Sequence, residues 1–159
     1  MSQLRIGDNA PDFRVKGVLR GQVVEYSLSS YPGKWLVLFF YPADFTFICP
    51  TEVTGFSKMA KEFSSENAAI LGASVDSIDS HRAWAEELGG LEYPLLSDED
   101  KTVSRTYGVL NEKEGVSLRA TFMINEKRSR LRERLYSPRR TRSSRRFSSP
   151  ELLFPSCSL

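Results

Sequence analysis

Side chains that usually bind metal ions are scarce in this chain. Its 159 residues include 2 cysteines and 1 histidine, too few for the usual four-ligand zinc site. It also lacks the run of roughly 20 apolar residues that a transmembrane helix needs. No apolar signal-peptide centre follows Met1. We therefore expect no metal site, no membrane association and a cytoplasmic location, where cysteines stay reduced.

Charge is abundant but unevenly distributed. Residues 1–126 hold 12 Lys+Arg and 18 Asp+Glu, which gives 12 − 18 = −6, whereas residues 127–159 hold 10 and 2, which gives +8. From Lys127 onward the chain consists mostly of arginine, serine, leucine and proline. This change predicts one folded domain over residues 1–126, followed by a basic Arg/Ser-rich tail over residues 127–159 that is disordered or irregular.

Hydrophobic patterning in the first 126 residues alternates between strands and helices. The apolar run over residues 35–41 is typical of a central strand buried on both faces. An early hairpin is predicted with its turn over residues 17–21. The remaining predictions are strands over 68–75, 93–96 and 117–124, and helices from 50, over 80–88 (capped by Asp79 or Ser80) and from 98 to 107 (capped by Asp98). This alternation favours an α/β domain.

Cys49 lies between the long apolar run and a predicted helix start. Pro50 suits the first position of a helix, which would place Cys49 beside unpaired N–H groups that favour an anion. A free thiol with a pKa near 8.5 is only ~3% ionised at neutral pH. Lowering that pKa to ~6 requires ~3.4 kcal/mol, whereas a helix terminus supplies ~0.3–2 kcal/mol. A cation is needed for the rest. The alternative is that Cys49 is an inert buried thiol, which is common.

Arg119 is the candidate for that cation. It stands in Ser-Leu-Arg-Ala-Thr-Phe, within a segment patterned as a core strand, where a charge needs a partner. A Cys49 thiolate together with Glu52 could be that partner, and the alternative is a surface charge on an edge strand. His81 is interpreted as a surface residue at a helix start rather than a base. A thioredoxin-type disulfide is disfavoured, because Glu52 stands where its second cysteine would be.

The segment Pro42-Ala-Asp-Phe-Thr46-Phe-Ile-Cys49-Pro-Thr-Glu resembles the peroxidatic motif of peroxiredoxins. The opening Gly-Asp-Asn-Ala-Pro-Asp-Phe and residues 74–84, 93–98 and 117–122 also resemble the typical two-cysteine branch, which includes the peroxidase subunit of alkyl hydroperoxide reductase. The resemblance covers roughly residues 3–126. It implies a thioredoxin-like fold, with a central mixed sheet flanked by helices, and thiol peroxidase activity.

The resemblance also implies a role for each motif residue. Cys49 as thiolate attacks the peroxide O–O bond and becomes a sulfenic acid. Thr46 holds the peroxide, Pro42 shields the pocket from water, Arg119 stabilises the thiolate and the developing charge, and Glu52 orients Arg119. No metal, haem or flavin cofactor is implied. The implied partners are a peroxide substrate, thioredoxin or a dedicated disulfide reductase as electron donor, and further copies of the chain in a homodimer or decamer.

The tail departs from the pattern of the family. The Val-Cys-Pro motif of the resolving cysteine is absent, which leaves Cys157 as the remaining candidate resolving thiol. The last strand and helix of the family are expected to be missing or altered, although residues 128–136 could form a basic edge strand or a helix. An out-of-frame or alternative product is one hypothesis for the abrupt change at residue 127.

Two non-enzymatic functions are the alternatives. The chain could be an inactive or truncated isoform that acts as a holdase. The basic run over residues 139–146 could instead bind nucleic acid through phosphates, but no aromatic platform accompanies it. A solvated tail is therefore the favoured interpretation of that run.

Overall fold

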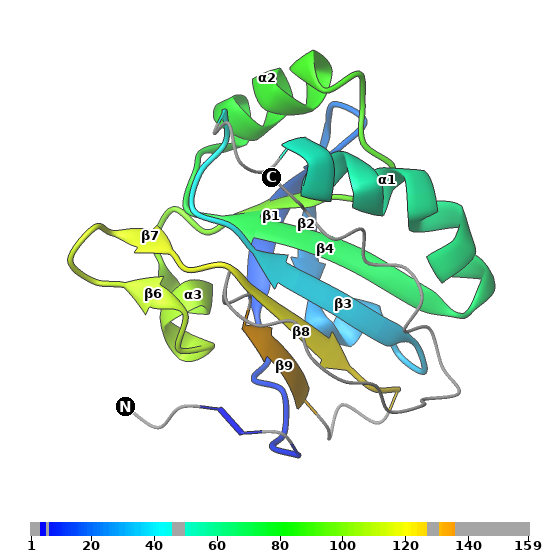
Figure 1. Cartoon of the computed structure of the whole chain (residues 1–159), viewed down its shortest axis with the longest axis vertical. Coiled ribbons are helices and arrows are strands. Elements are labelled where there is room, and N and C mark those ends of the chain that lie inside the picture. Colours follow the sequence, from blue (N-terminus) through cyan, green and yellow to red (C-terminus); the bar gives the residue numbers. More distant parts are fainter. Residues whose placement is uncertain (1–3, 6, 46–49, 127–130, 136–159) are drawn as a thin grey trace, which may run out of the picture.

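The computed structural model describes residues 4–5, 7–45, 50–126 and 131–135, the side chains of 50–53 and 131–135 excepted (Figure 1). The strands are β1 (Arg14–Leu19), β2 (Gln22–Ser27), β3 (Trp35–Phe40), β4 (Ala68–Ser74), β5 (Leu95–Ser97), β6 (Leu110–Asn111), β7 (Val116–Ser117), β8 (Ala120–Ile124) and β9 (Leu131–Leu135). The α-helices are α1 (Pro50–Ser65), α2 (Ile78–Glu87) and α3 (Thr102–Thr106), and a short 3-10 helix covers Leu28–Ser30.

Seven of the strands form one mixed sheet in the order β2-β1-β5-β4-β3-β8-β9. The pairs β3–β4 and β4–β5 are parallel, whereas β8 pairs antiparallel with both β3 and β9. Figure 1 shows α1 and α2 together on one side of this sheet. The chain therefore has the thioredoxin-like α/β fold that the sequence predicts. In the described part of the chain, no helix is long and apolar enough to cross a membrane.

Strand β3 forms the centre of two hydrophobic cores, one on each face of the sheet. Its side chains alternate, so that Leu38 belongs to one core and Phe39 to the other. On the helical face, Phe56 of α1 stacks on Phe39 with ring centroids 4.8 Å apart. On the opposite face, Tyr107 packs edge-on against Phe122 of β8 at 5.1 Å. The continuous apolar run is explained by this burial on both faces.

The first hairpin turns later than its glycines suggest. Arg20 and Gly21 have positive φ values of 49° and 76°, as a two-residue type I′ turn requires. Gly17 lies inside β1, where β5 approaches closely. A Cβ atom at this position would lie 2.8 Å from Leu96 Cδ2 and 2.9 Å from the Leu95 carbonyl oxygen. Gly17 therefore permits the close approach of β5, and the turn predicted over residues 17–21 occupies only its last two residues.

The predicted strand over residues 117–124 is interrupted. Ser117 ends β7, which forms an unpredicted hairpin with β6, and Ala120 begins β8. Between them, the Leu118 N–H group donates to the Val109 carbonyl at 2.7 Å, a bond outside the main sheet. The alternating apolar pattern continues across this break, so it could not show the interruption.

Two predicted helix starts also need correction. Ser77, and not Asp79 or Ser80, caps α2, and its hydroxyl accepts the Ser80 N–H bond at 3.2 Å. Helix α3 begins at Thr102 rather than directly after Asp98. The Asp98 carboxylate still accepts the first-turn N–H groups of Val103 and Ser104, at 3.0 and 2.7 Å, so it serves the capping function from outside the helix.

Strand β9 is the edge-strand alternative for the basic segment. It pairs antiparallel with β8, with Leu131 opposite Ile124 and Leu135 opposite Ala120. The sheet thus continues beyond residue 126, where the sequence places the boundary of the domain. The expectations for the last helix, the Arg/Ser-rich run and Cys157 lie outside the described residues.

Gly72 in β4 provides a test of the packing on the helical face. A Cβ atom there would lie 2.7 Å from Phe39 Cζ and 3.0 Å from Leu95 Cδ2. Both neighbours are buried, so we expect Gly72→Ala to lower the free energy of unfolding by about 1–3 kcal/mol through overpacking. Urea unfolding measures this change. The exposed Lys61→Ala, expected within about 0.5 kcal/mol of the wild type, is the control, and equal stabilities would contradict the packing.

Candidate functional site

The carboxyl ends of three parallel strands lie side by side at one end of the sheet. We call this end the C-terminal edge; it is not one of the two edge strands. β3 ends at Phe40, β4 at Ser74 and β5 at Ser97. Helix α1 connects the end of β3 to the start of β4, so it runs back along the sheet and its first residue, Pro50, lies at this edge (Figure 1). The prediction of a helix that begins at Pro50, immediately after Cys49, is confirmed. Cys49 itself and Thr46 lie outside the described residues.

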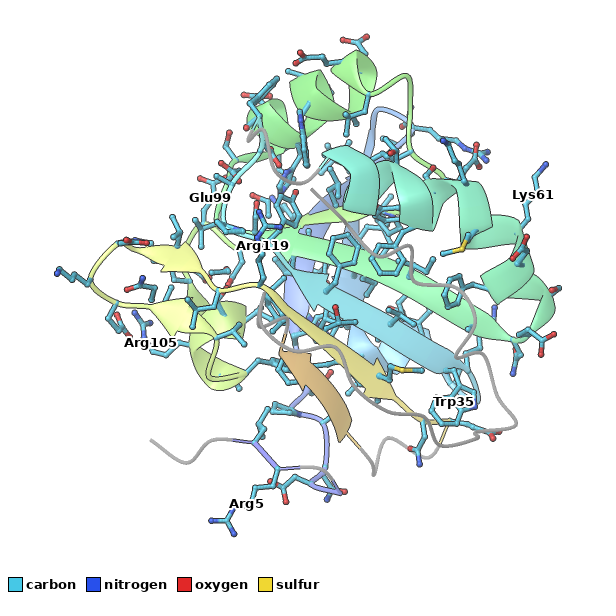
Figure 2. All side chains as sticks on the ribbon, in the orientation of Figure 1. Arg5, Trp35, Lys61, Glu99, Arg105 and Arg119 are labelled. Atoms are coloured by element: carbon cyan, nitrogen blue, oxygen red, sulfur yellow. The ribbon has the colours of Figure 1, made fainter. Side chains whose placement is uncertain are left out.

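Arg119 is brought to the same edge by the register of β3 and β8. Phe40 pairs with Ala120, so Arg119, one residue before β8, lies across from Tyr41, which immediately precedes Pro42. Figure 2 shows Arg119 beside the carboxyl end of β3. It is half-buried, and β8 lies inside the sheet between β3 and β9. β8 is therefore not an edge strand, and Arg119 lies at the same end of the sheet as Pro42.

A buried polar network fixes the segment that leads into Arg119. Ser104 Oγ donates to Asp98 Oδ2 at 2.6 Å, so its contact with Ser117 Oγ at 2.7 Å is one that Ser117 donates. All three residues are buried. Burial raises the pKa of Asp98, while the bonds from Ser104 and Val103 act in the opposite direction. The network ties α3 to β7, two residues before Arg119.

The start of the motif is held against β4. The Tyr41 N–H group donates to the Ala73 carbonyl at 3.1 Å, which extends the pairing of β3 and β4 by one residue. Pro42 is half-buried, and Asp44 is only 7% exposed. The Tyr41 hydroxyl donates to Asp44 Oδ1 at 2.7 Å. Glu52 lies in the first turn of α1, but its side chain is outside the described part of the chain.

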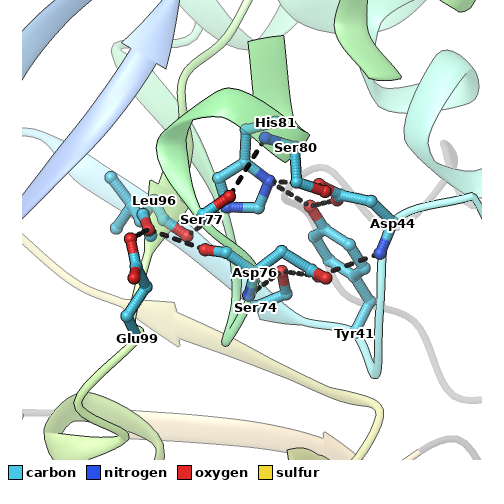
Figure 3. Close-up of polar contacts among 10 residues, drawn as sticks. Tyr41, Asp44, Ser74, Asp76, Ser77, Ser80, His81, Leu96 and Glu99 are labelled. Carbon is cyan, nitrogen blue, oxygen red and sulfur yellow. Dashed lines mark hydrogen bonds and ion pairs between the residues drawn. The ribbon is translucent and has the colours of Figure 1, made fainter. Parts of the chain in front are cut away.

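His81 is buried, contrary to the surface position expected from the sequence. Its side chain is 0% exposed, and both ring nitrogens have partners (Figure 3). Nδ1 lies 2.8 Å from Asp44 Oδ2, and Nε2 donates to the Leu96 carbonyl at 2.9 Å. The surface interpretation failed because His81 lies three residues before Trp84 on the buried face of α2.

Asp44, Asp76 and His81 are the residues of this edge that the functional prediction missed. A signal for the two carboxylates was present, since each closely follows the carboxyl end of a buried strand, where polar groups of an α/β sheet converge. The position of His81 depends on the direction in which a helix face points, which its short sequence pattern does not fix.

Burial of the tyrosines predicts a loss of stability in alkali. Burial raises the pKa of Tyr41 and Tyr93 well above 10.0, the Asp44 charge raises that of Tyr41 further, and burial raises that of Tyr31 to about 12. Since each folded-state pKa exceeds the unfolded value, the neutral phenols stabilise the fold fully below pH 10.0. This contribution is lost as the pH rises through the folded values, by up to about 1.4 kcal/mol per unit and group.

Urea unfolding between about pH 9 and pH 12 measures this alkaline loss. Tyrosinate absorbance should rise together with unfolding, and Tyr93→Phe should reduce the slope of stability against pH. Constant stability across this range would contradict the burial of these phenols.

The described residues also line a depression of about 490 Å³, formed mainly by β1 and α3 together with Ser97 at the end of β5. It lies around Phe13, Arg14, Val103 and Tyr107. Neither Pro42 nor Arg119 is among the residues that line it. The candidate site is therefore defined by the strand ends and the start of α1, rather than by this depression.

Comparison with known proteins gives a consistent family assignment. The model of the AhpC/TSA family matches residues 6–131. The peroxiredoxin prdx-2 of Caenorhabditis elegans is 47% identical over 131 residues, which cover 79% of this chain and 65% of the relative. The mitochondrial thioredoxin-dependent peroxide reductase of Drosophila melanogaster is 48% identical over 131 residues, 79% of this chain and 56% of the relative. The chain thus spans somewhat over half the length of these two relatives.

Solved structures agree with the sequence match. Mycobacterium bovis AhpC superposes with a TM-score of 0.78 at 35% identity. The match covers 86% of this chain and 84% of the M. bovis chain. The reduced 2-Cys peroxiredoxin of Plasmodium vivax gives a TM-score of 0.77 at 34% identity, with coverages of 87% and 89%. By sequence and by fold, the chain belongs to the AhpC/TSA family and is a peroxiredoxin that resembles two-cysteine members.

Proposed function

We propose that the chain is a thiol-dependent peroxidase that reduces hydrogen peroxide and organic hydroperoxides through Cys49. The observation that carries this proposal is the meeting of the start of α1 with Arg119 at one edge of the sheet. A helix N-terminus and a guanidinium each stabilise a thiolate, so both lower the pKa of a nearby cysteine. The membership in the AhpC/TSA family and the relative named a thioredoxin-dependent peroxide reductase support the same reaction.

The chemistry begins with the Cys49 thiolate. It attacks one peroxide oxygen, so an S–O bond forms while the O–O bond breaks. The peroxide is reduced by two electrons, its second oxygen leaves as alkoxide or hydroxide and takes a proton, and Cys49 becomes a sulfenic acid. In this proposal Thr46 holds the peroxide, Pro42 excludes water, Arg119 stabilises the charge on the oxygens, and Glu52 orients Arg119.

A thiol must then return Cys49 to its reduced form. Attack of a second thiol on the sulfenic acid forms a disulfide and releases water, and a further dithiol reduces that disulfide. We propose thioredoxin or a dedicated disulfide reductase as the donor, with Cys157 as the candidate resolving thiol and an external thiol as the alternative. No metal or organic cofactor enters this cycle.

We also propose a cellular location and an assembly for the enzyme. A reducing compartment, the cytoplasm, would keep Cys49 as a thiol. Relatives named as mitochondrial and chloroplastic show that the family also works in organelles. A homodimer or decamer is the proposed assembly. No observation favours the holdase or the nucleic-acid binder, whose basic run lies outside the described residues.

Peroxide consumption in the presence of a thiol reductant tests the proposed function. The full chain should consume hydrogen peroxide and a bulky organic hydroperoxide with dithiothreitol, and faster with thioredoxin and its reductase. Cys157→Ser should slow the thioredoxin-coupled reaction more than the dithiothreitol reaction if Cys157 resolves the sulfenic acid. A folded chain that consumes peroxide no faster than its buffer would contradict the proposal.

A further inference from the structure

Asp44 is held both through its side chain and through its backbone. The Ser80 hydroxyl donates to Asp44 Oδ2 at 2.8 Å, beside the contact of His81 Nδ1 with the same oxygen, while the Tyr41 hydroxyl occupies Oδ1. The Asp44 N–H group donates to Asp76 Oδ2 at 2.9 Å. Four groups, from α2 and from the segments that follow β3 and β4, therefore fix one loop residue (Figure 3).

The second carboxylate of the cluster is itself fixed. The Ser74 hydroxyl donates to Asp76 Oδ2 at 2.6 Å, and the Ser97 hydroxyl donates to the Asp76 carbonyl at 2.6 Å. Ser74 and Ser97 are the last residues of β4 and β5. The loop that contains Asp44 is thus connected to the ends of two central strands of the sheet.

Each hydrogen-bond donor that faces Asp44 or belongs to His81 has an acceptor in the cluster. The Leu96 carbonyl can only accept, so His81 Nε2 carries a hydrogen. The hydroxyls of Tyr41 and Ser80 give their single hydrogens to Asp44. One further hydrogen lies between His81 Nδ1 and Asp44 Oδ2, so the buried pair is neutral as a whole. Loss of either partner would leave a buried polar group without its complement.

The residue after Asp44 has an unusual backbone conformation. Phe45 follows Asp44 and has a φ of 58°, which side chains larger than glycine rarely adopt. Its ring lies against Trp84 of α2, with centroids 6.4 Å apart. Phe45 is the last described residue of this loop. An unusual backbone conformation of this kind persists where surrounding contacts determine it.

From these contacts we propose that His81 and Asp44 are positioning residues that fix the geometry of the peroxide pocket. They act by orienting the backbone of residues 42–45, and so place Pro42 relative to Arg119. This inference rests on the proposed peroxidase function and adds a specific role for the buried cluster. Neither residue touches the peroxide, and neither exchanges a proton with it.

Two reactions of the same thiol distinguish positioning from simple stability. Alkylation of Cys49 by iodoacetamide needs only the thiolate, whereas peroxide reduction also needs the pocket around it. We expect His81→Ala and Asp44→Ala to lower the ratio of the peroxide rate to the alkylation rate about 100-fold, since a displacement of about 1 Å at a reacting centre has that effect. Asp44→Asn, which keeps the shape and two acceptor contacts, should restore most of this ratio.

A milder variant and a matched control complete the test. Ser80→Ala removes one hydroxyl contact to Asp44 and should lower the ratio several-fold while the chain stays folded. Val103→Ala creates a cavity in the core on the opposite face and should reduce stability without altering the ratio. Unchanged ratios in Ser80→Ala and in a folded His81 variant, or an equal fall in Val103→Ala, would overturn the proposal. If wild-type Cys49 alkylates but does not react with peroxide, the proposed function itself has failed.

Discussion

Replacement of Cys49 by serine is expected to abolish peroxide reduction by the full chain. A serine hydroxyl stays protonated at neutral pH and is a far weaker nucleophile than a thiolate. Loss of a covalent nucleophile lowers turnover by as much as about 10⁶-fold in well-studied enzymes. We expect the rate to fall to that of the uncatalysed reaction, with no change in the cooperative unfolding of the chain.

The matched control is the same substitution at the other cysteine. Cys157→Ser should leave the first oxidation at its wild-type rate, because Cys157 is proposed only for the later resolving step. Single-turnover measurements with limiting peroxide, without any reductant, separate the two steps. Peroxide loss that persists in Cys49→Ser and disappears in Cys157→Ser would reverse the assignment of the two cysteines.

Arg119→Gln is expected to have the next largest effect. Glutamine retains hydrogen-bond donors but removes the positive charge that the register of β3 and β8 places beside the motif. Loss of one such stabilising group costs about 10²–10³-fold in rate. The thiolate fraction of Cys49 should also fall at neutral pH, because a helix N-terminus alone supplies only part of the required stabilisation. The pH profile of peroxide reduction should therefore move toward higher pH.

Two variants serve as controls for this prediction. Arg119→Lys keeps the charge but not the planar donors, so its rate should lie between those of the wild type and Arg119→Gln. Arg105→Gln removes the same side chain from an exposed pair with Glu112 at 3.0 Å and should change the rate by less than about twofold. An unshifted pH profile in Arg119→Gln would show that Arg119 does not act on the thiolate.

The fold was largely predictable because the core pattern is strong. The apolar run over residues 35–41 and the helix from Pro50 follow from local sequence, and both appear as expected. The interruption before Arg119 was not predictable, because a bond from Leu118 to Val109 replaces the sheet pairing there. The apolar alternation matches burial at Ala120, Phe122 and Ile124, but Leu118 is exposed where the backbone leaves the sheet.

The candidate site was predictable only in part. The motif indicated Pro42, and a charge in an apolar segment indicated Arg119, which the structure places at the same edge. The pairing of Asp44 with His81 was missed, because its members are 37 residues apart and meet only once α2 docks on the sheet.

Mass spectrometry after one equivalent of hydrogen peroxide tests the central claim most directly. The reduced full chain is mixed with peroxide and a reagent that traps sulfenic acids. It is then digested with a protease, and the modified peptides are identified by tandem mass spectrometry. The proposed chemistry predicts a single added oxygen, as a trapped sulfenic acid, on Cys49, or a disulfide between Cys49 and Cys157. An unmodified Cys49 thiol in the folded chain, with the peroxide unconsumed, would contradict it.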